Sequence, residues 1–195
     1  MKTFHKAIIG TLFILSLLSI YYGAYRPFVK SQMYLRAQRA AMLVHNTDEV
    51  ERIFSEVFDY ASPIGEEEIV KFSLEFVQNA MYAPDASEEA ILDLLQYVEE
   101  RIDERDIIHL VQMGNAYDAL WRNTGNEKYF TRAEEYYKKV LAAGPRLPQG
   151  LYSMFNLYGA AGMADELRAI AKRILAIWPE DERVQKVLKT IESGI

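Results

Sequence analysis

A chain of 195 residues, half of them hydrophobic, is long enough to bury a core, and because it contains no cysteine, disulfides and zinc–thiolate sites are excluded. The net charge is −6, but the charges lie in blocks. Residues 1–45 carry six basic and no acidic residues, whereas residues 46–104 carry 17 acidic and three basic residues. Such an acidic block would be repelled by phosphate polymers, which argues against nucleic acid as a partner.

The first element is an uncharged apolar stretch, residues 7–25. At a rise of about 1.5 Å per residue it would be about 28 Å long as a helix, which matches the hydrocarbon core of a bilayer. Aromatic residues that prefer the membrane–water interface gather at its end: Tyr21, Tyr22, Tyr25 and Phe28. We therefore predict a transmembrane or signal-anchor helix within residues 1–26, with the lipid bilayer as a partner.

A cleaved signal peptide is the alternative, because Lys2 and Lys6 supply a basic start before the apolar run. The end of the run favours retention, since the bulky Tyr22 stands where cleavage after Ala24 requires a small residue. The basic residues on the two sides of the span are nearly balanced and do not decide its orientation. Because a short basic start before an apolar run is typical of exported proteins, we expect the following domain outside the cytoplasm.

Residues 27–104 are predicted to form acidic helical pairs. Strand-like alternation is missing, and apolar residues recur at spacings of three and four, as at Phe54, Val57, Phe58 and Ala61. Glu66, Glu67 and Glu68 follow a Pro-Ile-Gly turn, where acidic residues favour the positive end of a helix dipole. We assign them to the first turn of a helix in preference to a metal site. The predicted fold class is all-α.

Residues 105–195 contain an internal repeat. KKVLAAGP at 138–145 returns after 34 positions as KRILAIWP at 172–179, and MGNAY at 113–117 returns after 41 positions as MFNLY at 154–158. The first copy therefore has seven more residues between its halves, about two helical turns, which keeps buried side chains on the same face. Leu141 and Leu175 are then expected to be equivalent buried residues in the second helix of each pair.

A 34-residue helix-turn-helix unit that ends in proline and has an aromatic residue in its first helix resembles a tetratricopeptide repeat. The earlier copy keeps Gly114, Tyr117, Ala133, Tyr137 and Pro145 of that pattern, and the later copy keeps Tyr158, Gly162 and Pro179. Leu167 and Ala171 depart from it, because the family usually places a small residue and then an aromatic residue there. The resemblance covers residues 106–180. It implies a solenoid of antiparallel helical pairs, closed by a capping helix, that binds a protein or peptide in a concave surface.

A second resemblance covers more of the chain. The order of a membrane helix, a basic turn, the segment FDYASPIGEEEI and helical pairs containing ALWRNTGNEKY is similar to the tail of some bacterial O-antigen ligase-like proteins. It implies a place in the bacterial cell envelope but no catalytic residue, because that family's catalytic loops lie between many membrane spans. The alternative function is accordingly a non-catalytic accessory or tail of a glycan assembly system.

Candidate binding residues lie in the first helix of each pair. Asn115 and Asn156 occupy equivalent positions, and an amide that both donates and accepts can hold an extended peptide by its backbone. Tyr152 and Asp118 are expected beside them. The alternative, that both asparagines bond to neighbouring turns within the stack, remains open. Val111 stands where some family members place a basic residue of a carboxylate clamp.

Catalytic patterns are missing from the sequence. His5, His45 and His109 have no metal-ligand spacing, and no phosphate-binding loop or nucleophile motif occurs. We predict a protein that is not an enzyme and needs no cofactor or metal. Its expected function is that of a membrane-anchored scaffold for protein–protein interaction in the bacterial cell envelope.

Overall fold

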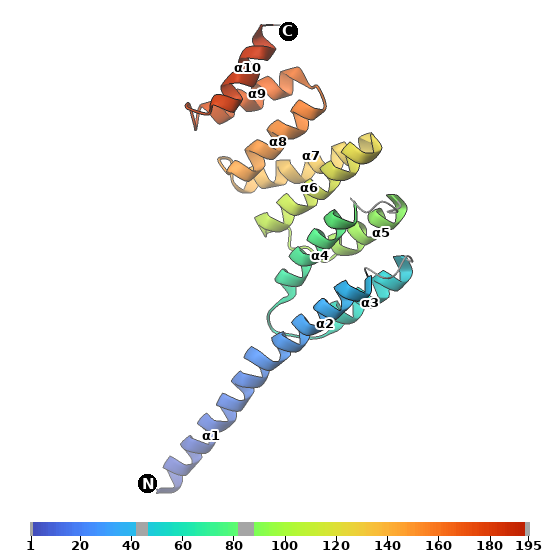
Figure 1. The fold of residues 1–195 in the computed structure, drawn as a ribbon. Coiled ribbons are helices and arrows are strands. Elements are labelled where there is room, and N and C mark those ends of the chain that lie inside the picture. The colour runs from blue at the N-terminus through green and yellow to red at the C-terminus, as the bar shows by residue number, and fades with distance from the viewer. Residues whose placement is uncertain (1, 42–46, 82–87, 194–195) are drawn as a thin grey trace. The chain divides into compact units, whose positions relative to one another are not determined.

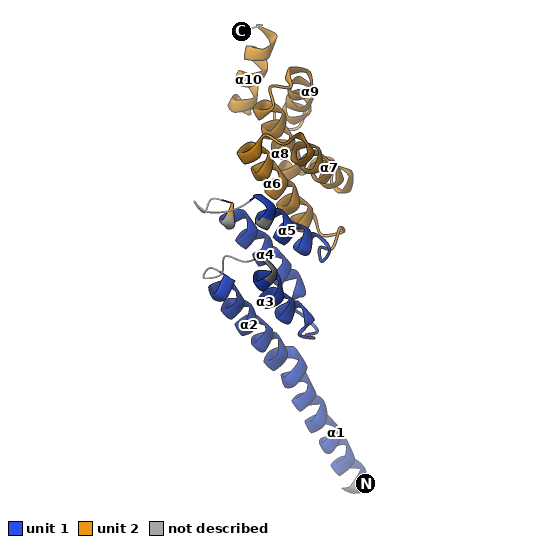
Figure 2. Ribbon diagram, turned by 90° about the vertical axis from the view of Figure 1, so that its right-hand side faces the viewer, with its two compact units in different colours: residues 1–80, 84–102 blue, residues 81–83, 103–195 orange. Residues whose placement is uncertain are grey.

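The structure is a computed structural model that describes residues 2–41, 47–81 and 88–193, and within these residues every regular element is a helix (Figure 1). The predicted all-α fold class is confirmed. Two compact units divide the chain (Figure 2): unit 1 comprises residues 1–80 and 84–102, and unit 2 comprises residues 81–83 and 103–195. His45 lies outside the described residues.

The chain begins with a continuous helix built from α1 (Lys2–Ile20), a π-helical turn η1 (Tyr21–Tyr25) and α2 (Arg26–Ala41). In the π-helical turn the N–H of Arg26 donates to the carbonyl of Tyr21, five residues earlier. Pro27 explains this widening, because proline lacks an N–H and its ring clashes with the carbonyl four residues before it. The side chains from Phe4 to Tyr25 are all exposed. One helix of the described residues, Phe4–Ala41, is long and apolar enough to cross a membrane.

In unit 1, α2 packs against α3 (Thr47–Asp59) and α4 (Glu66–Ala80), and α5 (Glu88–Glu99) packs against α3 and α4. Three residues of the predicted apolar stripe, Phe54, Val57 and Phe58, are buried in its core, where the Phe54 ring lies 6.2 Å from that of Tyr34. The prediction is wrong for Ala61, which is exposed because α3 ends at Asp59. Glu66, Glu67 and Glu68 form the first turn of α4, as predicted from the helix dipole. Glu66 also accepts a hydrogen bond from Lys30 on α2 at 3.2 Å.

Unit 2 contains α6 (Ile107–Thr124), α7 (Glu127–Ala143), α8 (Pro148–Ala160), α9 (Ala164–Leu175) and α10 (Glu182–Glu192). Short polar residues begin three of them: Asp106, Asn126 and Asp181 each accept a hydrogen bond from a backbone N–H of the first turn. Gly125 ends α6 at φ 70°, a conformation that favours glycine. Helices α6 and α7 form the first pair, α8 and α9 the second, and α10 packs on α9.

The two pairs differ in length as the repeat spacings predict, although the difference is distributed over both helices. Measured from the repeated tyrosines Tyr117 and Tyr158, the first helix is five residues longer in the earlier pair. The second helix is three residues longer before the repeated lysines Lys138 and Lys172, and the connecting loop is one residue shorter. An antiparallel pair must lengthen both arms to keep them in contact, which explains why the insertion is divided.

The buried positions of the second helices differ in part from the prediction. Leu141 is buried, with 9% of its surface exposed, but Leu175 is half-buried, so the expected equivalence is wrong. The residues one position earlier, Val140 and Ile174, are both fully buried. Since neighbouring residues on a helix point about 100° apart, the apolar face of α9 passes through Ile174 and leaves Leu175 at its edge.

The departure at Ala171 has a counterpart on the first helix of its pair. In the earlier pair Gly114 leaves room for the ring of Tyr137: a Cβ at Gly114 would lie 2.4 Å from Tyr137 Cε1. In the later pair the equivalent positions hold Phe155 and Ala171, both buried. A small residue facing a large one is thus replaced by a large residue facing a small one, which conserves the volume between the helices.

Candidate functional site

A groove of about 680 Å³ lies on unit 2 along the first helices of the pairs. Its walls come from α6, α8, α9 and α10, and its lining residues are Asp118, Arg122, Phe155, Asn156, Gly159, Leu167 and Val187. Apolar and polar side chains therefore share one recess, as in binding sites that bury an apolar group and orient it with a few polar contacts.

The polar wall on α6 is an ion pair. Arg122 donates to both carboxylate oxygens of Asp118, from Nε at 2.8 Å and from Nη2 at 3.1 Å. The two residues are four positions apart on one helix, where side chains are neighbours. Nη2 of Arg122 also lies 3.4 Å from the backbone carbonyl of Asn156 on α8. This pair therefore links the first helices of the two repeats at the groove.

The two repeated asparagines have different surroundings. Asn115 accepts a hydrogen bond at 2.8 Å from the hydroxyl of Tyr137, whose side chain is 1% exposed. Burial raises the pKa of Tyr137 above its ordinary value, which keeps the hydroxyl a donor. Asn156 has alanine, Ala171, at the position equivalent to Tyr137, and its side-chain oxygen accepts instead a long hydrogen bond, 3.4 Å, from the exposed Arg183.

Tyr152 supports the start of α10. Its hydroxyl donates to Asp181, which also accepts from the N–H of Val184 at 2.9 Å as the cap of that helix. The Tyr152 hydroxyl is the main cause of a lowered pKa of Asp181, and the Val184 N–H adds to it. The Tyr152 ring stacks on Trp178 at 5.8 Å. Through these contacts Tyr152, on α8, helps to attach α10 to the second helical pair.

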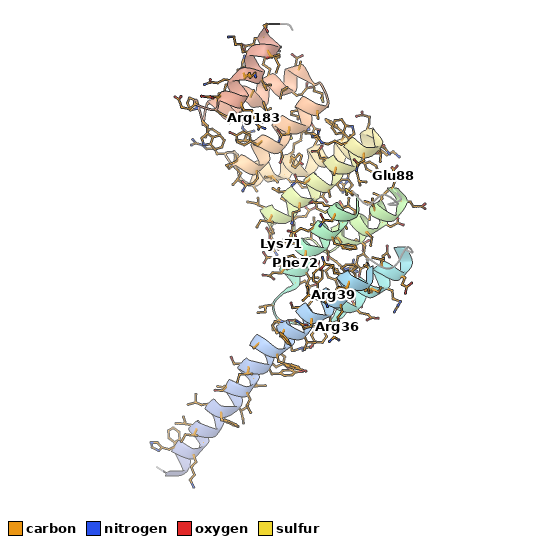
Figure 3. The ribbon with its side chains drawn as sticks, viewed as in Figure 1. Arg36, Arg39, Lys71, Phe72, Glu88 and Arg183 are labelled. Carbon is orange, nitrogen blue, oxygen red and sulfur yellow. The ribbon has the colours of Figure 1, made fainter. Side chains whose placement is uncertain are left out.

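Two of the four predicted binding residues, Asp118 and Asn156, thus line one groove of the described chain, whereas Asn115 and Tyr152 are not among its lining residues. Sequence reasoning missed Arg122, Phe155 and Arg183. The four-residue spacing from Asp118 could have indicated Arg122. Arg183, labelled in Figure 3, reaches this region from α10 and lies 5.3 Å from the centroid of the Phe155 ring. No local pattern connects it with Asn156.

The described histidine of unit 2 has a structural role. His109 is 2% exposed, and its Nδ1 accepts a hydrogen bond at 3.1 Å from the N–H of Asp103. Its Nε2 lies 3.9 Å from the carboxylate of Asp106, the cap of α6. Among the residues that the structure describes, no group of three or more His, Asp or Glu side chains could hold a metal ion.

No protein-family model matches the chain, and no curated protein matches it. Among solved structures the chain is similar to the crystal structure of a thermophilic TPR protein of Thermus thermophilus. That similarity covers 84% of this chain and 81% of that chain, with 18% sequence identity and a TM-score of 0.49. The tetratricopeptide-like character of the helical pairs rests on the repeats in residues 113–179 and on the buried repeated residues Met113, Tyr117, Met154 and Tyr158.

Proposed function

We propose that this protein is a membrane-anchored scaffold of the bacterial cell envelope that holds a protein partner in the groove of unit 2. The observation that carries the proposal is the groove itself, in which an apolar floor of Phe155 and Leu167 adjoins the amide of Asn156. An extended segment of a partner can place an apolar side chain on this floor. The amide then meets the backbone of that segment as donor and acceptor.

Asn156 is the better suited of the two asparagines for this role. Both side chains are exposed, but the Asn115 amide oxygen accepts a hydrogen bond from Tyr137 at 2.8 Å, whereas the Asn156 amide oxygen has only a long contact, 3.4 Å, to Arg183. The Asp118–Arg122 pair holds the α6 wall beside it. A backbone N–H of the partner can therefore replace Arg183 as the donor to the Asn156 amide oxygen without breaking a buried hydrogen bond.

A photo-crosslinking residue at Val187, in the groove, is expected to capture the partner in cell membranes. The matched control is the same residue at Ala142, which is exposed on α7 and lies outside the groove lining. Asn156→Ala should weaken the capture at Val187, by a loss of about 1–3 kcal/mol of binding free energy, because a partner backbone group loses its hydrogen bond. Equal capture from Val187 and Ala142, insensitive to Asn156→Ala, would remove the groove as the binding site.

Asn115→Ala gives the complementary result, because the buried Tyr137 hydroxyl loses its acceptor. We expect it to lower the free energy of unfolding by about 1 kcal/mol, with little effect on the partner affinity of the folded protein. Asn156→Ala should leave the melting temperature nearly unchanged. Thermal unfolding of both variants, measured with the full chain in detergent, separates a binding asparagine from a structural one.

Anchoring is supported by the exposed, uncharged surface of residues 7–25, which in water would leave apolar side chains such as Phe13 and Leu15 without a partner. The protein is expected to stay in the membrane fraction after a carbonate wash and to require detergent for extraction. Its intact mass should include the first 25 residues. A mature chain that begins near Arg26 would contradict the anchor and support a cleaved signal peptide.

We further propose that the domain after the anchor lies outside the cytoplasm. The support is the basic start at Lys2 and Lys6 before the apolar helix. Protease added to spheroplasts is expected to digest residues 47–193 and to leave a cytoplasmic control protein intact. Protection of these residues until the membrane is permeabilised would reverse the orientation.

A further inference from the structure

The loop between α3 and α4, residues 60–65, is held against the beginning of α2 at both of its ends. At the first end, the guanidinium of Arg26 lies 5.3 Å from the centroid of the Tyr60 ring. At the second end, Lys30 donates to the Glu66 carboxylate at 3.2 Å, and the Lys30 side chain is 1% exposed. The loop is therefore fixed beside the first five residues of α2.

These five residues directly follow the predicted span, which sets the depth of the loop. The last residue of the uncharged stretch is Tyr25, and Arg26 to Lys30 extends only about 6 Å along the helix. The headgroup layer on each side of a bilayer is about 5–8 Å thick. If residues 7–25 fill the hydrocarbon core, both attachments of the loop lie at the level of the lipid headgroups.

The loop has the composition of a membrane-contacting turn. Residues 60–65 read YASPIG and carry no charge, within a block that has 17 acidic and three basic residues. Ile64 at the tip of the turn is 58% exposed, and Ala61 and Pro63 are exposed as well. The hydroxyl of Ser62 donates to the Ile64 carbonyl at 2.6 Å, and Gly65 turns the chain at φ 95°. Ile64 is thus presented by an ordered turn.

The helix presents similar side chains close to the same level. Tyr22 and Tyr25 are 46% and 55% exposed, and Phe28 is 61% exposed. Aromatic rings and a neighbouring aliphatic side chain are the groups that lie favourably at the boundary between headgroups and acyl chains. Helices α2 and α4 run in the same direction away from this level. Glu66 near the start of α4 contacts Lys30, and Phe72 farther along α4 stacks on Tyr34 farther along α2.

From this arrangement we propose that the α3–α4 loop is a second membrane contact, with Ile64 inserted among the lipid headgroups beside the anchor. The proposal rests on the membrane anchoring proposed above and adds a second, peripheral point of attachment. Two points of attachment restrict the rotation and tilt of unit 1 relative to the bilayer, which a single helix leaves free. The partner of this surface is the bilayer itself.

The test uses the full chain reconstituted at one copy per lipid nanodisc of phosphatidylcholine and phosphatidylglycerol. The sequence has no cysteine, so a single environment-sensitive fluorophore can be attached at Ile64→Cys, Leu15→Cys or Glu88→Cys without other changes. Leu15 lies within the span and is 55% exposed. Glu88 is exposed at the start of α5, at the end of unit 1 remote from α1 (Figure 3).

We expect quenching of the Ile64→Cys label by an aqueous quencher to be on the order of threefold weaker than quenching of the Glu88→Cys label. A quencher carried at shallow depth on a lipid should act on the label at position 64 and not on the label at position 88. A label at 64 that is quenched from water as strongly as that at 88, while the label at 15 stays protected, overturns the loop contact alone.

Two other outcomes also overturn the proposal. Water access at both positions 15 and 64 overturns the anchor and the loop contact together. Protection of position 64 from both the aqueous and the lipid-borne quencher means that protein, and not lipid, covers Ile64.

Discussion

Replacing Ile174 by alanine is expected to destabilise unit 2 by about 2–5 kcal/mol, because its side chain is fully buried where α9 packs within the second pair. For a unit of this size each kcal/mol lowers the melting temperature by about 4–8 °C. Thermal unfolding of the full chain in detergent, followed by circular dichroism, measures the change.

Leu175→Ala is the matched control, since it removes a similar number of atoms from the neighbouring position of the same helix. Leu175 is half-buried, so its replacement should cost clearly less than that of Ile174. Equal costs at the two positions would show that the apolar face of α9 does not pass through Ile174. Costs below about 0.5 kcal/mol at both would mean that α9 does not pack as described.

Gly114→Ala is expected to destabilise the first pair by about 1–3 kcal/mol through overpacking. The added Cβ would lie 2.4 Å from Cε1 and 2.7 Å from Cδ1 of Tyr137. That ring cannot move easily, because it is buried and its hydroxyl is bonded to Asn115. Urea unfolding of the full chain measures the loss.

Gly159 on α8 provides the control, because a Cβ there would meet Leu167 only at 3.8 Å, an ordinary contact. Gly159→Ala should therefore be neutral or stabilise the protein by up to about 1 kcal/mol, the difference in helix propensity.

The exchange of large and small residues between the two pairs can also be tested directly. Gly114→Phe combined with Tyr137→Ala copies the Phe155 and Ala171 pair of the second repeat. The double variant should lose less free energy of unfolding than the sum of the losses of the two single variants. Additive losses would refute the idea that the large and small residues compensate each other in volume.

The sequence alone was sufficient for the features that depend on local chemistry. Periodicity at three and four residues predicts helices because it places apolar side chains on one face, and the described residues are helical throughout their regular elements. The repeated Met and Tyr positions are buried in both copies for the same reason. The uncharged residues 7–25 form a helix with exposed side chains, as an apolar stretch of that length predicts.

The tertiary structure decided which equivalent residues have equivalent surroundings. Asn115 and Asn156 match in the repeat, but only Asn115 faces a tyrosine hydroxyl, because the second helix of the later pair carries Ala171 there. The groove likewise joins Asp118 and Arg122 of α6 to Val187 of α10, residues far apart in sequence. The spacing of apolar residues along a helix predicts its buried face to within about one residue, which is about 100° of rotation. Which side chains then meet across two helices is determined only by how the helices pack.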